Sequence, residues 1–455
     1  MSLLNKISAF CTKRIGYPKV KLEEVFTPAT AANINYITRN EIDGILASEM
    51  STPGKQIVVY GHSGSGKTSS VRKLLRDSGH NYIRTHCESC TTFEQLILNA
   101  FDELDVFILS EKTKQVSKVF KGELELEYKK IKSAIGKEQT VEEGVSMTRL
   151  LPPQLTPQKL AQFLGVGKIV WLIEDFHKVC NTEKKRIADV IKIFVDNAND
   201  YESSKIICIG ACQSAHELLQ LDPNLKSRVS EVSVPLLHDE EIRSIVENGF
   251  CLLRVDAPQS LVEKLVYYSD RLGASAHQMC MDICKGEGIM MTGWSRHKIN
   301  DTAFQFAIDG FIKRSSDTLK SLYEAAVKNE IGWYILRSFS KNTMDKLSIA
   351  QISHLVNMGK QHFTYEEIVA KLDELCSPAC GIIYYNTNSE KYALSSPFWH
   401  RFLRLQFSIE NANKQKKKNN SKNPNLIITN DARYQIVDES LFEFIKQLKK
   451  MRAFN

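Results

Sequence analysis

The stretch Gly61-His62-Ser63-Gly64-Ser65-Gly66-Lys67-Thr68 carries the strongest structural signal in this sequence. It matches the pattern GxxxxGK[ST], directly after the apolar run Gln56–Tyr60 and directly before a helix that we expect at Ser69–Leu75. Glycines let the backbone curl so that its N–H groups converge on phosphate oxygens, and the following helix points its positive end at the same anion. Lys67 would supply a charge to the phosphates, and Thr68 a hydroxyl to Mg²⁺. The pattern predicts that residues 61–69 bind ATP with Mg²⁺.

A second signal is the apolar run from Lys168 that ends in Glu174 and Asp175. A phosphate-binding loop works with carboxylates on a neighbouring strand, one of which holds Mg²⁺ through water while the other activates the attacking water. Counting along the run gives Glu174 the metal side and Asp175 the role of base. In the usual order the shorter aspartate holds the metal and the longer glutamate is the base. The order here is the reverse, so the exchanged assignment stays open. We expect Thr68 and Glu174 as the magnesium residues.

Between residues 35 and 237, short apolar runs alternate with amphipathic helices, which is typical of a parallel sheet covered by helices on both faces. The expected strands are Gln56–Tyr60, Asn81–Cys87, Lys168–Asp175, Lys205–Cys212 and Val232–Leu236. We expect a helix at Glu183–Asn199 between two of them. Residues 113–155 interrupt this alternation, and their pattern suits a strand or a helix.

Beyond residue 237 the pattern becomes helical. Asp239 opens one helix with three acids in a row, which suits the positive end of a helix dipole. We expect a helical lid at 238–318, and at 319–408 helices followed by a hairpin that turns at Asn386–Ser389. Three helices and a hairpin in this order predict a winged helix. A lead segment (1–34) and a lysine-rich linker with a C-terminal helix near Glu439–Met451 (409–455) flank these parts.

The net charge of +7 is concentrated in one short segment. Between residues 411 and 430 there are five lysines and no acids, namely Lys414, Lys416, Lys417, Lys418 and Lys422. Without them, 55 basic residues face 53 acidic ones. A nearly neutral body does not indicate a general nucleic-acid-binding surface. We interpret the lysine run as a solvated linker and regard DNA contact through Lys414–Lys422 as the less favoured reading.

Length and hydropathy exclude other classes of protein. At roughly 150 residues per domain, 455 residues predict about three domains. The longest apolar stretches, such as Ile206–Cys212, run to about seven residues, whereas a membrane span needs about 20. The first residues lack a signal-peptide pattern, and the eleven scattered cysteines suit a reducing compartment. We expect a cytoplasmic protein without a membrane span.

The segment Tyr36–Glu41, the phosphate-binding loop, the pair Glu174–Asp175 and the strand Lys205–Cys212 together resemble the AAA+ superfamily. Within it, the sequence is similar to the Orc/Cdc6-like and STAND-like ATPases of bacteria and archaea, over about residues 35–408. The resemblance implies that Tyr36, Ile37 and Arg39 lie near the adenine. The local sequence also predicts that Thr38 and Glu41 form a capping box that starts a helix.

The resemblance further implies residues that sense or complete the nucleotide site. Gln213 or Ser214 would be the polar sensor after the fourth strand, and Arg228 would reach the γ-phosphate of a neighbouring subunit. An ordinary surface arginine is an equal alternative for Arg228. The usual lid arginine is displaced or missing in Arg271–His277, which favours a slow switch over a fast motor. For His277 itself we expect a structural role.

The third helix of the winged helix, expected at Thr364–Leu375, starts with a capping box of Thr364 and Glu367. Its four acids and one lysine oppose entry into a groove lined by phosphates, which favours contact with protein. We therefore expect a Mg²⁺-dependent AAA+ ATPase that acts as a nucleotide-controlled switch or assembly platform, with a homo-oligomeric state and a partner effector protein. The alternatives are a DNA-associated ATPase (a loader or transposition helper) and a non-hydrolysing ATP-binding adaptor.

Overall fold

The computed structural model describes residues 19–89, 91–109, 155–179, 181–201, 204–211, 225–314, 317–341, 346–358, 362–387 and 389–422. The chain divides into two compact units, of which one spans Ala31–Leu236 and the other joins Met1–Thr30 to Leu237–Asn455. Residues 113–154, the candidate sensors Gln213 and Ser214, and the predicted helix near Glu439–Met451 lie outside the described residues. None of the helices in the described part of the chain is both long and apolar enough to cross a bilayer.

A five-stranded parallel sheet forms the centre of the unit 31–236, in the order β2-β3-β4-β1-β5. The strands are β1 (Gln56–Tyr60), β2 (Asn81–His86), β3 (Ile169–Glu174), β4 (Ile206–Gly210) and β5 (Val229–Ser233). The predicted α/β fold is confirmed, but β5 lies three residues before its predicted position. Only Val229 and Val232 of its five residues are buried, so β5 is not an apolar run, and Pro235 lacks the N–H that the predicted run would need to continue the ladder.

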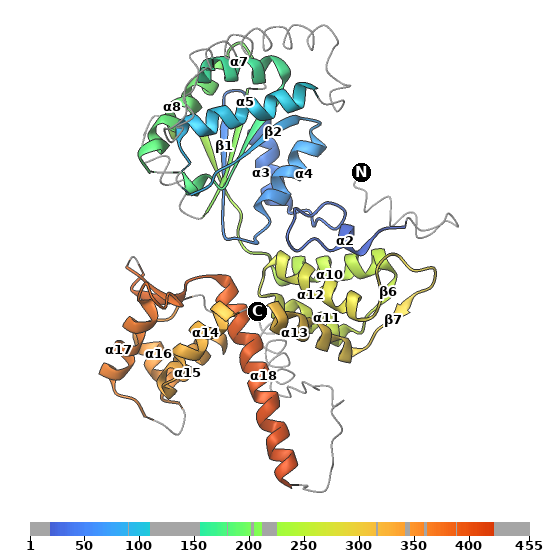
Figure 1. Ribbon diagram of the computed structural model, residues 1–455, viewed down its shortest axis with the longest axis vertical. Coiled ribbons are helices and arrows are strands. Elements are labelled where there is room, and N and C mark those ends of the chain that lie inside the picture. The colour runs from blue at the N-terminus through green and yellow to red at the C-terminus, as the bar shows by residue number, and fades with distance from the viewer. Residues whose placement is uncertain are drawn as a thin grey trace, which may run out of the picture. The chain divides into compact units, whose positions relative to one another are not determined.

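Helices cover both faces of this sheet (Figure 1). α3 (Asn40–Ser51) and α4 (Lys67–Asp77) cover one face, and α5 (Phe93–Leu109), α7 (Pro157–Gly167) and α8 (Asn181–Asn197) cover the other. Successive strand residues point to opposite faces, so Ile57 and Val59 enter the core under α3 and α4, while Val58 enters the other core. The three inner strands β1, β3 and β4 are therefore almost continuously apolar, which is why the sequence revealed them.

The start of α3 differs from its prediction. The helix begins at Asn40, so the N-cap is Arg39 and Thr38 lies one residue outside the helix. No side chain caps this end; the backbone N–H of Arg39 donates to Asp43 Oδ2 at 3.2 Å instead. A capping box joins the N-cap to the third helical residue, and Glu41 is the second. The predicted box of Thr38 and Glu41 is therefore wrong.

The first part of the other unit is a helical lid. Its helices are α10 (Asp239–Leu253), α11 (Gln259–Ser269), α12 (Gly273–Gly286) and α13 (Phe304–Arg314). The predicted start at Asp239 is confirmed, and the Glu241 carboxylate accepts the N–H of His238 at 2.7 Å. Two short parallel strands, β6 (Val255–Asp256) and β7 (His297–Lys298), were not predicted. Strands of two residues are too short to produce a periodic pattern.

Residues 19–30 of the lead segment belong to the same unit as the lid. Its short helix α2 (Leu22–Val25) is followed by Phe26, whose buried ring lies 6.0 Å from the Phe250 ring and 5.9 Å from the His277 ring. The N–H of Thr27 donates to Nδ1 of His277 at 3.1 Å. Burial lowers the pKa of His277 to about 4, so the ring is neutral and accepts this bond. The predicted structural role of His277 is confirmed.

The rest of this unit follows the order of a winged helix. After α14 (Asp317–Ala326) come α15 (Glu330–Lys341), α16 (Ile349–Val356), α17 (Tyr365–Cys376) and the antiparallel hairpin of β8 (Ile383–Asn386) and β9 (Lys391–Leu394). Leu347 and Tyr392 exchange two backbone hydrogen bonds of 2.8 Å, so the segment at Leu347 pairs with β9 as a short third strand position. The capping box of Thr364 and Glu367 is confirmed, with bonds of 2.8 and 3.3 Å.

The lysine run lies on a helix. α18 (Pro397–Lys422) continues without a break through Lys414, Lys416, Lys417, Lys418 and Lys422, so the linker predicted from residue 409 is wrong as far as residue 422. The sequence there looks like a solvated segment because it lacks apolar residues. Lysine and glutamine are nevertheless good helix formers, and cations are favourable near a helix C-terminus.

Acid should destabilise the lid unit through His277. A folded-state pKa of about 4 lies below the unfolded value of about 6.5, so the neutral ring contributes stability that is present above pH 6.5 and is lost as the pH falls toward 4. Between about pH 7 and pH 5 we expect a loss on the order of 2 kcal/mol in the free energy of unfolding. His277→Asn, which keeps an acceptor without titrating, should flatten this dependence in urea unfolding. The exposed His297→Asn serves as the control, and equal pH dependence in both variants would contradict the assignment.

Candidate functional site

The loop between β1 and α4 depends on glycine at both of its ends. Gly61 has φ 154°, and a Cβ built on it would lie 2.3 Å from the carbonyl oxygen of Val234. Gly66 is the N-cap of α4 and has φ 95°, in the left-handed region. Any other residue at 61 would collide with backbone that cannot move aside. The loop therefore curls tightly over the end of β1, as the sequence pattern predicts.

The first turn of α4 faces this loop with its backbone N–H groups. Among the described residues no side chain caps the helix, so the N-terminal N–H groups remain directed at the loop. The hydroxyl of Ser65 is buried and has no hydrogen-bond partner within the described part of the chain. The ammonium of Lys67 donates to the carbonyl oxygens of Gly61 and His62, both at 2.8 Å. The structure thus brings residues 61–69 together as a cradle for an anion, with the lysine over it.

Glu174 ends β3 at the same edge of the sheet, because parallel strands share their carboxyl edge. Its side chain is sheltered, with the residue 9% exposed. Oε2 lies 3.2 Å from Nδ1 of His86 and 4.0 Å from a guanidinium nitrogen of Arg84. Oε1 is buried and accepts no hydrogen bond from any described residue. An acceptor left in this state is unfavourable unless a ligand satisfies it.

Asp175 has a different environment although it is the next residue. Its backbone is left-handed, with φ 57°, which turns its side chain away from the strand direction. The carboxylate is half exposed, and Oδ2 lies 2.7 Å from Nζ of Lys178. The two carboxylates therefore divide into a sheltered one and an accessible one paired with a cation.

His86 and Arg84 were missed in the sequence. His86 is the register partner of Glu174 across β2 and β3, and Arg84 lies two residues earlier on the same face of β2. Nothing in the local sequence marks these residues, because the pairing of strands that are far apart in the chain brings them to Glu174. The sequence offered one indication of this pairing. Both predicted strands end near these residues, and parallel strands end at the same edge of a sheet.

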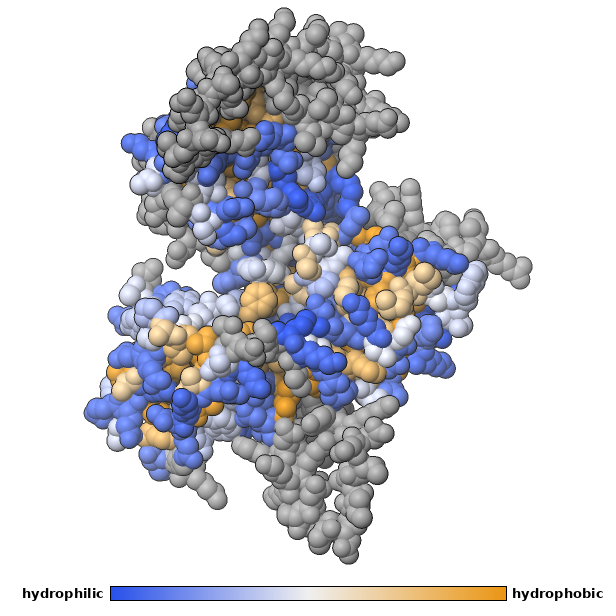
Figure 2. Space-filling view, in the orientation of Figure 1, coloured by the Kyte–Doolittle hydropathy of each residue, from blue (hydrophilic) through white to orange (hydrophobic). Residues whose placement is uncertain are grey.

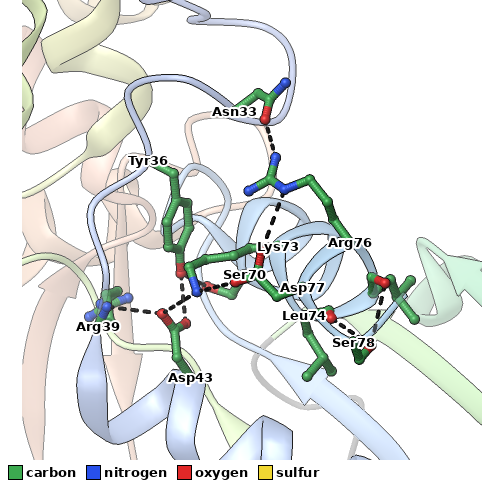
Figure 3. A network of polar contacts seen from close by, with 11 residues as sticks. Asn33, Tyr36, Arg39, Asp43, Ser70, Lys73, Leu74, Arg76, Asp77 and Ser78 are labelled. Atoms are coloured by element: carbon green, nitrogen blue, oxygen red, sulfur yellow. Dashed lines mark hydrogen bonds and ion pairs between the residues drawn. The ribbon is translucent and has the colours of Figure 1, made fainter. Parts of the chain in front are cut away.

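Tyr36 is held by polar contacts between α3 and α4 (Figure 3). Its hydroxyl donates to Asp43 Oδ1 at 2.7 Å and lies 3.0 Å from the Ser70 hydroxyl. Burial raises the pKa of Tyr36 above its ordinary value, and Asp43 adds to this effect. Lys73 lies 3.7 Å from Asp43 and 5.7 Å from the centre of the Tyr36 ring. Tyr36 thus lies beside the first turn of α4, where its hydroxyl contacts that of Ser70.

Arg39 connects the loop to the segment after β5. Its guanidinium is buried and donates to the carbonyl oxygens of Pro235 at 3.0 Å, Ser65 at 3.4 Å and Leu236 at 3.5 Å. Ile37 lies between Tyr36 and Arg39 in sequence and is half-buried. All three residues lie in the segment beside the loop, and their contact with adenine stays a prediction.

Arg228 lies at the other end of the strands. It is exposed in the turn before β5, and its carbonyl oxygen accepts the N–H of Gln56, the first residue of β1, at 2.9 Å. The phosphate-binding loop follows the last residue of β1. Arg271, in the lid turn between α11 and α12, has φ 61° and donates through Nε to the Leu237 carbonyl at 3.2 Å. Neither arginine is part of the cradle.

A match to a family model supports the nucleotide-binding interpretation. Residues 57–235 match the family described as "ATPase family associated with various cellular activities (AAA)". No curated protein matches the chain. Among solved structures, a Walker-type ATPase of Pyrococcus abyssi is 16% identical, with 84% of this chain and 99% of that chain covered and a TM-score of 0.49.

Two further solved structures show a similar coverage. The ORC2 protein of Aeropyrum pernix, in ADPNP–ADP complexes, is 13% identical, with 86% and 98% covered and a TM-score of 0.44. The RuvB Holliday junction branch migration motor of Thermotoga maritima is 10% identical, with 80% and 95% covered and a TM-score of 0.37. The matched segment 57–235 contains the loop, the carboxylate pair and, apart from the first residue of β1, all five strands of the sheet, so this part of the chain is similar to the AAA ATPases.

Proposed function

We propose that the protein is a Mg²⁺-dependent ATPase whose nucleotide state controls its assembly or its contact with a partner protein. The observation that carries this proposal is the joint position of the glycine cradle and the unsatisfied carboxylate of Glu174 at one edge of the sheet. Each supplies what the other lacks, since the cradle binds phosphate and the carboxylate binds a cation that neutralises it.

The cradle residues have distinct parts in holding ATP. The N–H groups of the loop and of the first turn of α4 would bind the phosphate oxygens, and the buried Ser65 hydroxyl supports the loop beneath them. Lys67 would exchange its two carbonyl acceptors for phosphate oxygens, which carry full charge and therefore bind an ammonium more strongly. Tyr36, Ile37 and Arg39 would border the base.

Thr68 and Glu174 fit a magnesium ion by their chemistry. Hydroxyl and carboxylate oxygens are the ligands that Mg²⁺ prefers, and the ion usually keeps several waters as well. The free Oε1 of Glu174 is the acceptor that a water of the ion would satisfy. When bound, the ion neutralises charge on the phosphates. His86 fixes the other carboxylate oxygen and so orients Glu174.

Asp175 is the proposed base for hydrolysis. It is accessible, and as a carboxylate it accepts the proton of the attacking water once Lys178 releases it. The ion pair with Lys178 equally supports the alternative of a non-hydrolysing adaptor, in which Asp175 stays engaged. Turnover measurements with the intact chain separate the two functions.

Arg228 can serve only another subunit. β5 runs for five residues between the Arg228 turn and the end of the sheet that carries the loop, which is roughly 16 Å at about 3.3 Å per residue. An arginine side chain does not span that distance to its own loop. Its exposure suits contact with the γ-phosphate bound by a neighbouring protomer, so we propose a homo-oligomer in which hydrolysis depends on assembly.

A DNA-associated function is the second candidate, because the five lysines at the end of α18 form the most basic segment of the chain. The acidic α17 and the nearly neutral body oppose it. Stimulation of turnover by duplex DNA would favour this candidate over the protein-controlled switch.

The first prediction for the nucleotide site concerns Lys67. Lys67→Ala should weaken Mg-ATP binding by about 100-fold or more, because it removes the phosphate cation, while the fold stays intact. Titration calorimetry measures the affinity, and circular dichroism checks the fold. Lys192→Ala, on the exposed side of α8, is the control. Unchanged affinity in a folded Lys67→Ala protein would refute the site.

The carboxylates should separate binding from turnover. Asp175→Asn should bind Mg-ATP normally and lose roughly 10²–10⁴-fold in turnover, because the water loses its base. Glu174→Gln should instead raise the Mg²⁺ concentration needed for half-maximal turnover. Both quantities come from steady-state phosphate release at varied Mg²⁺. If the two effects are exchanged, Glu174 is the base and Asp175 the metal residue.

Mixing variants tests Arg228. Arg228→Ala should bind ATP normally and hydrolyse it poorly, and a trans arginine in GTPases contributes about 10³–10⁵ in rate, which sets the scale. Adding Lys67→Ala protein should restore part of the activity, since intact loops then meet intact arginines. The neighbouring exposed lysine provides the control Lys226→Ala. Turnover that is independent of protein concentration and shows no rescue would mean that Arg228 is an ordinary surface residue.

A further inference from the structure

α17 and the hairpin β8–β9 present a cluster of tyrosines. Tyr365 at the start of α17 is 56% exposed, and Tyr385 on β8 is 46% exposed. Tyr392 on β9 is the register partner of Tyr385, and their ring centres lie 5.0 Å apart. Tyrosine is enriched at protein interfaces, because its ring packs while its hydroxyl can still bond. We call the surface of Tyr365, Asp373, Tyr385 and Tyr392 the tyrosine face.

Helical spacing and strand pairing bring these residues together. Tyr365, Val369, Asp373 and Cys376 follow one another at intervals of three or four residues and share one side of α17. α17 packs against β8. Partial burial raises the pKa of Tyr392 most, and Asp373, Cys376, Tyr385 and Tyr365 add to this effect. The packing of α17 on β8 joins the helix side of the cluster to the hairpin.

The charge around the tyrosine face is negative. α17 carries Glu366, Glu367, Asp373 and Glu374, and its single cation, Lys371, is buried and lies 2.7 Å from Glu374. Lys391 precedes Tyr392 on β9, but successive strand residues point to opposite sides, so its side chain faces away from the tyrosine face. In a winged helix the third helix is the element that enters a DNA groove, and this one would meet phosphates with carboxylates.

We infer that the tyrosine face binds a lysine- or arginine-bearing segment of a partner protein, a role that rests on the proposed function as a partner-controlled switch. Cations bind over tyrosine rings, and guanidinium groups pair with carboxylates through two hydrogen bonds. On the visible face, Figure 2 shows hydrophobic residues over the winged-helix part in separate patches between hydrophilic ones. The rings and carboxylates of the tyrosine face suit recognition of a charged segment better than a broad apolar interface.

A binding experiment on the full-length protein tests this inference. The probes are a fluorescein-labelled arginine–serine repeat peptide and a labelled DNA duplex, measured by fluorescence anisotropy at increasing salt. We expect salt-sensitive peptide binding that weakens about tenfold or more in Tyr365→Ala, Tyr385→Ala and Asp373→Lys. Tyr385→Phe, which keeps the ring, should retain most of the affinity.

Two matched controls separate the face from general electrostatics. Tyr384→Ala removes a tyrosine that is 41% exposed on the same strand but points to the opposite side of the hairpin. Glu324→Lys changes the net charge by the same amount as Asp373→Lys does, but the change lies on the exposed surface of α14. Both should leave peptide affinity unchanged, and a loss equal to that of Tyr385→Ala would overturn the inference.

The remaining outcomes are equally distinct. Duplex binding that requires Tyr365 and Asp373, without peptide binding, would make the face a DNA contact and overturn the inference. Self-association lost on Tyr365→Ala, seen by sedimentation, would identify a second copy as the occupant and also overturn it. Mg-ATP affinity should be normal in every tyrosine-face variant. If the intact chain binds peptide through the face but binds no ATP, the proposed function fails while the inference stands.

Discussion

No side-chain carbon fits at residue 61, and the nucleotide site depends on that constraint. The carbonyl oxygen of Val234 occupies the position that a Cβ would take, so the chain leaving β1 must pass directly against the segment that leaves β5. This close approach sets the curl of the loop, and the left-handed Gly66 then directs the chain into α4. Ser65, Lys67 and Thr68 acquire their positions from these two glycines.

The sheet supplies the second half of the site by its direction. Parallel strands end at one edge, so Glu174 and His86 come to the same side as the loop although they lie far from it in the sequence. Burial leaves Glu174 with an oxygen that accepts no hydrogen bond from the described residues. The left-handed backbone at Asp175 places the next carboxylate in contact with Lys178. Two adjacent acids thereby acquire different chemistry.

The sequence was most informative where structure depends on local composition. Continuous apolar runs located β1, β3 and β4 within one or two residues, and the glycine pattern located the loop, because both are determined by neighbours in the chain. β5 was misplaced because its sequence VSEVS holds only two buried residues, so the more apolar segment after it was chosen. The end of α18 was mistaken for a linker because lysines without apolar residues give no periodicity.

Features that arise from distant contacts could not be predicted. The pairing of His86 with Glu174 depends on strand register, and the packing of Phe26 and Thr27 on His277 joins residues about 250 positions apart. The buried position of Arg39, the N-cap of α3, likewise depends on distant residues, because its guanidinium donates to the carbonyl oxygens of Ser65, Pro235 and Leu236.

The position of Arg228 at the amino edge of the sheet, opposite the loop, gives the ATPase domain two unlike ends. Under a two-fold rotation such a contact would occur twice, with each subunit's arginine against the other's loop, whereas a head-to-tail contact would build a closed ring or an open helix. In a ring every loop meets an arginine. In an open helix one terminal loop lacks an arginine, so the fraction of active sites rises with the number of subunits and identifies the length of the assembly.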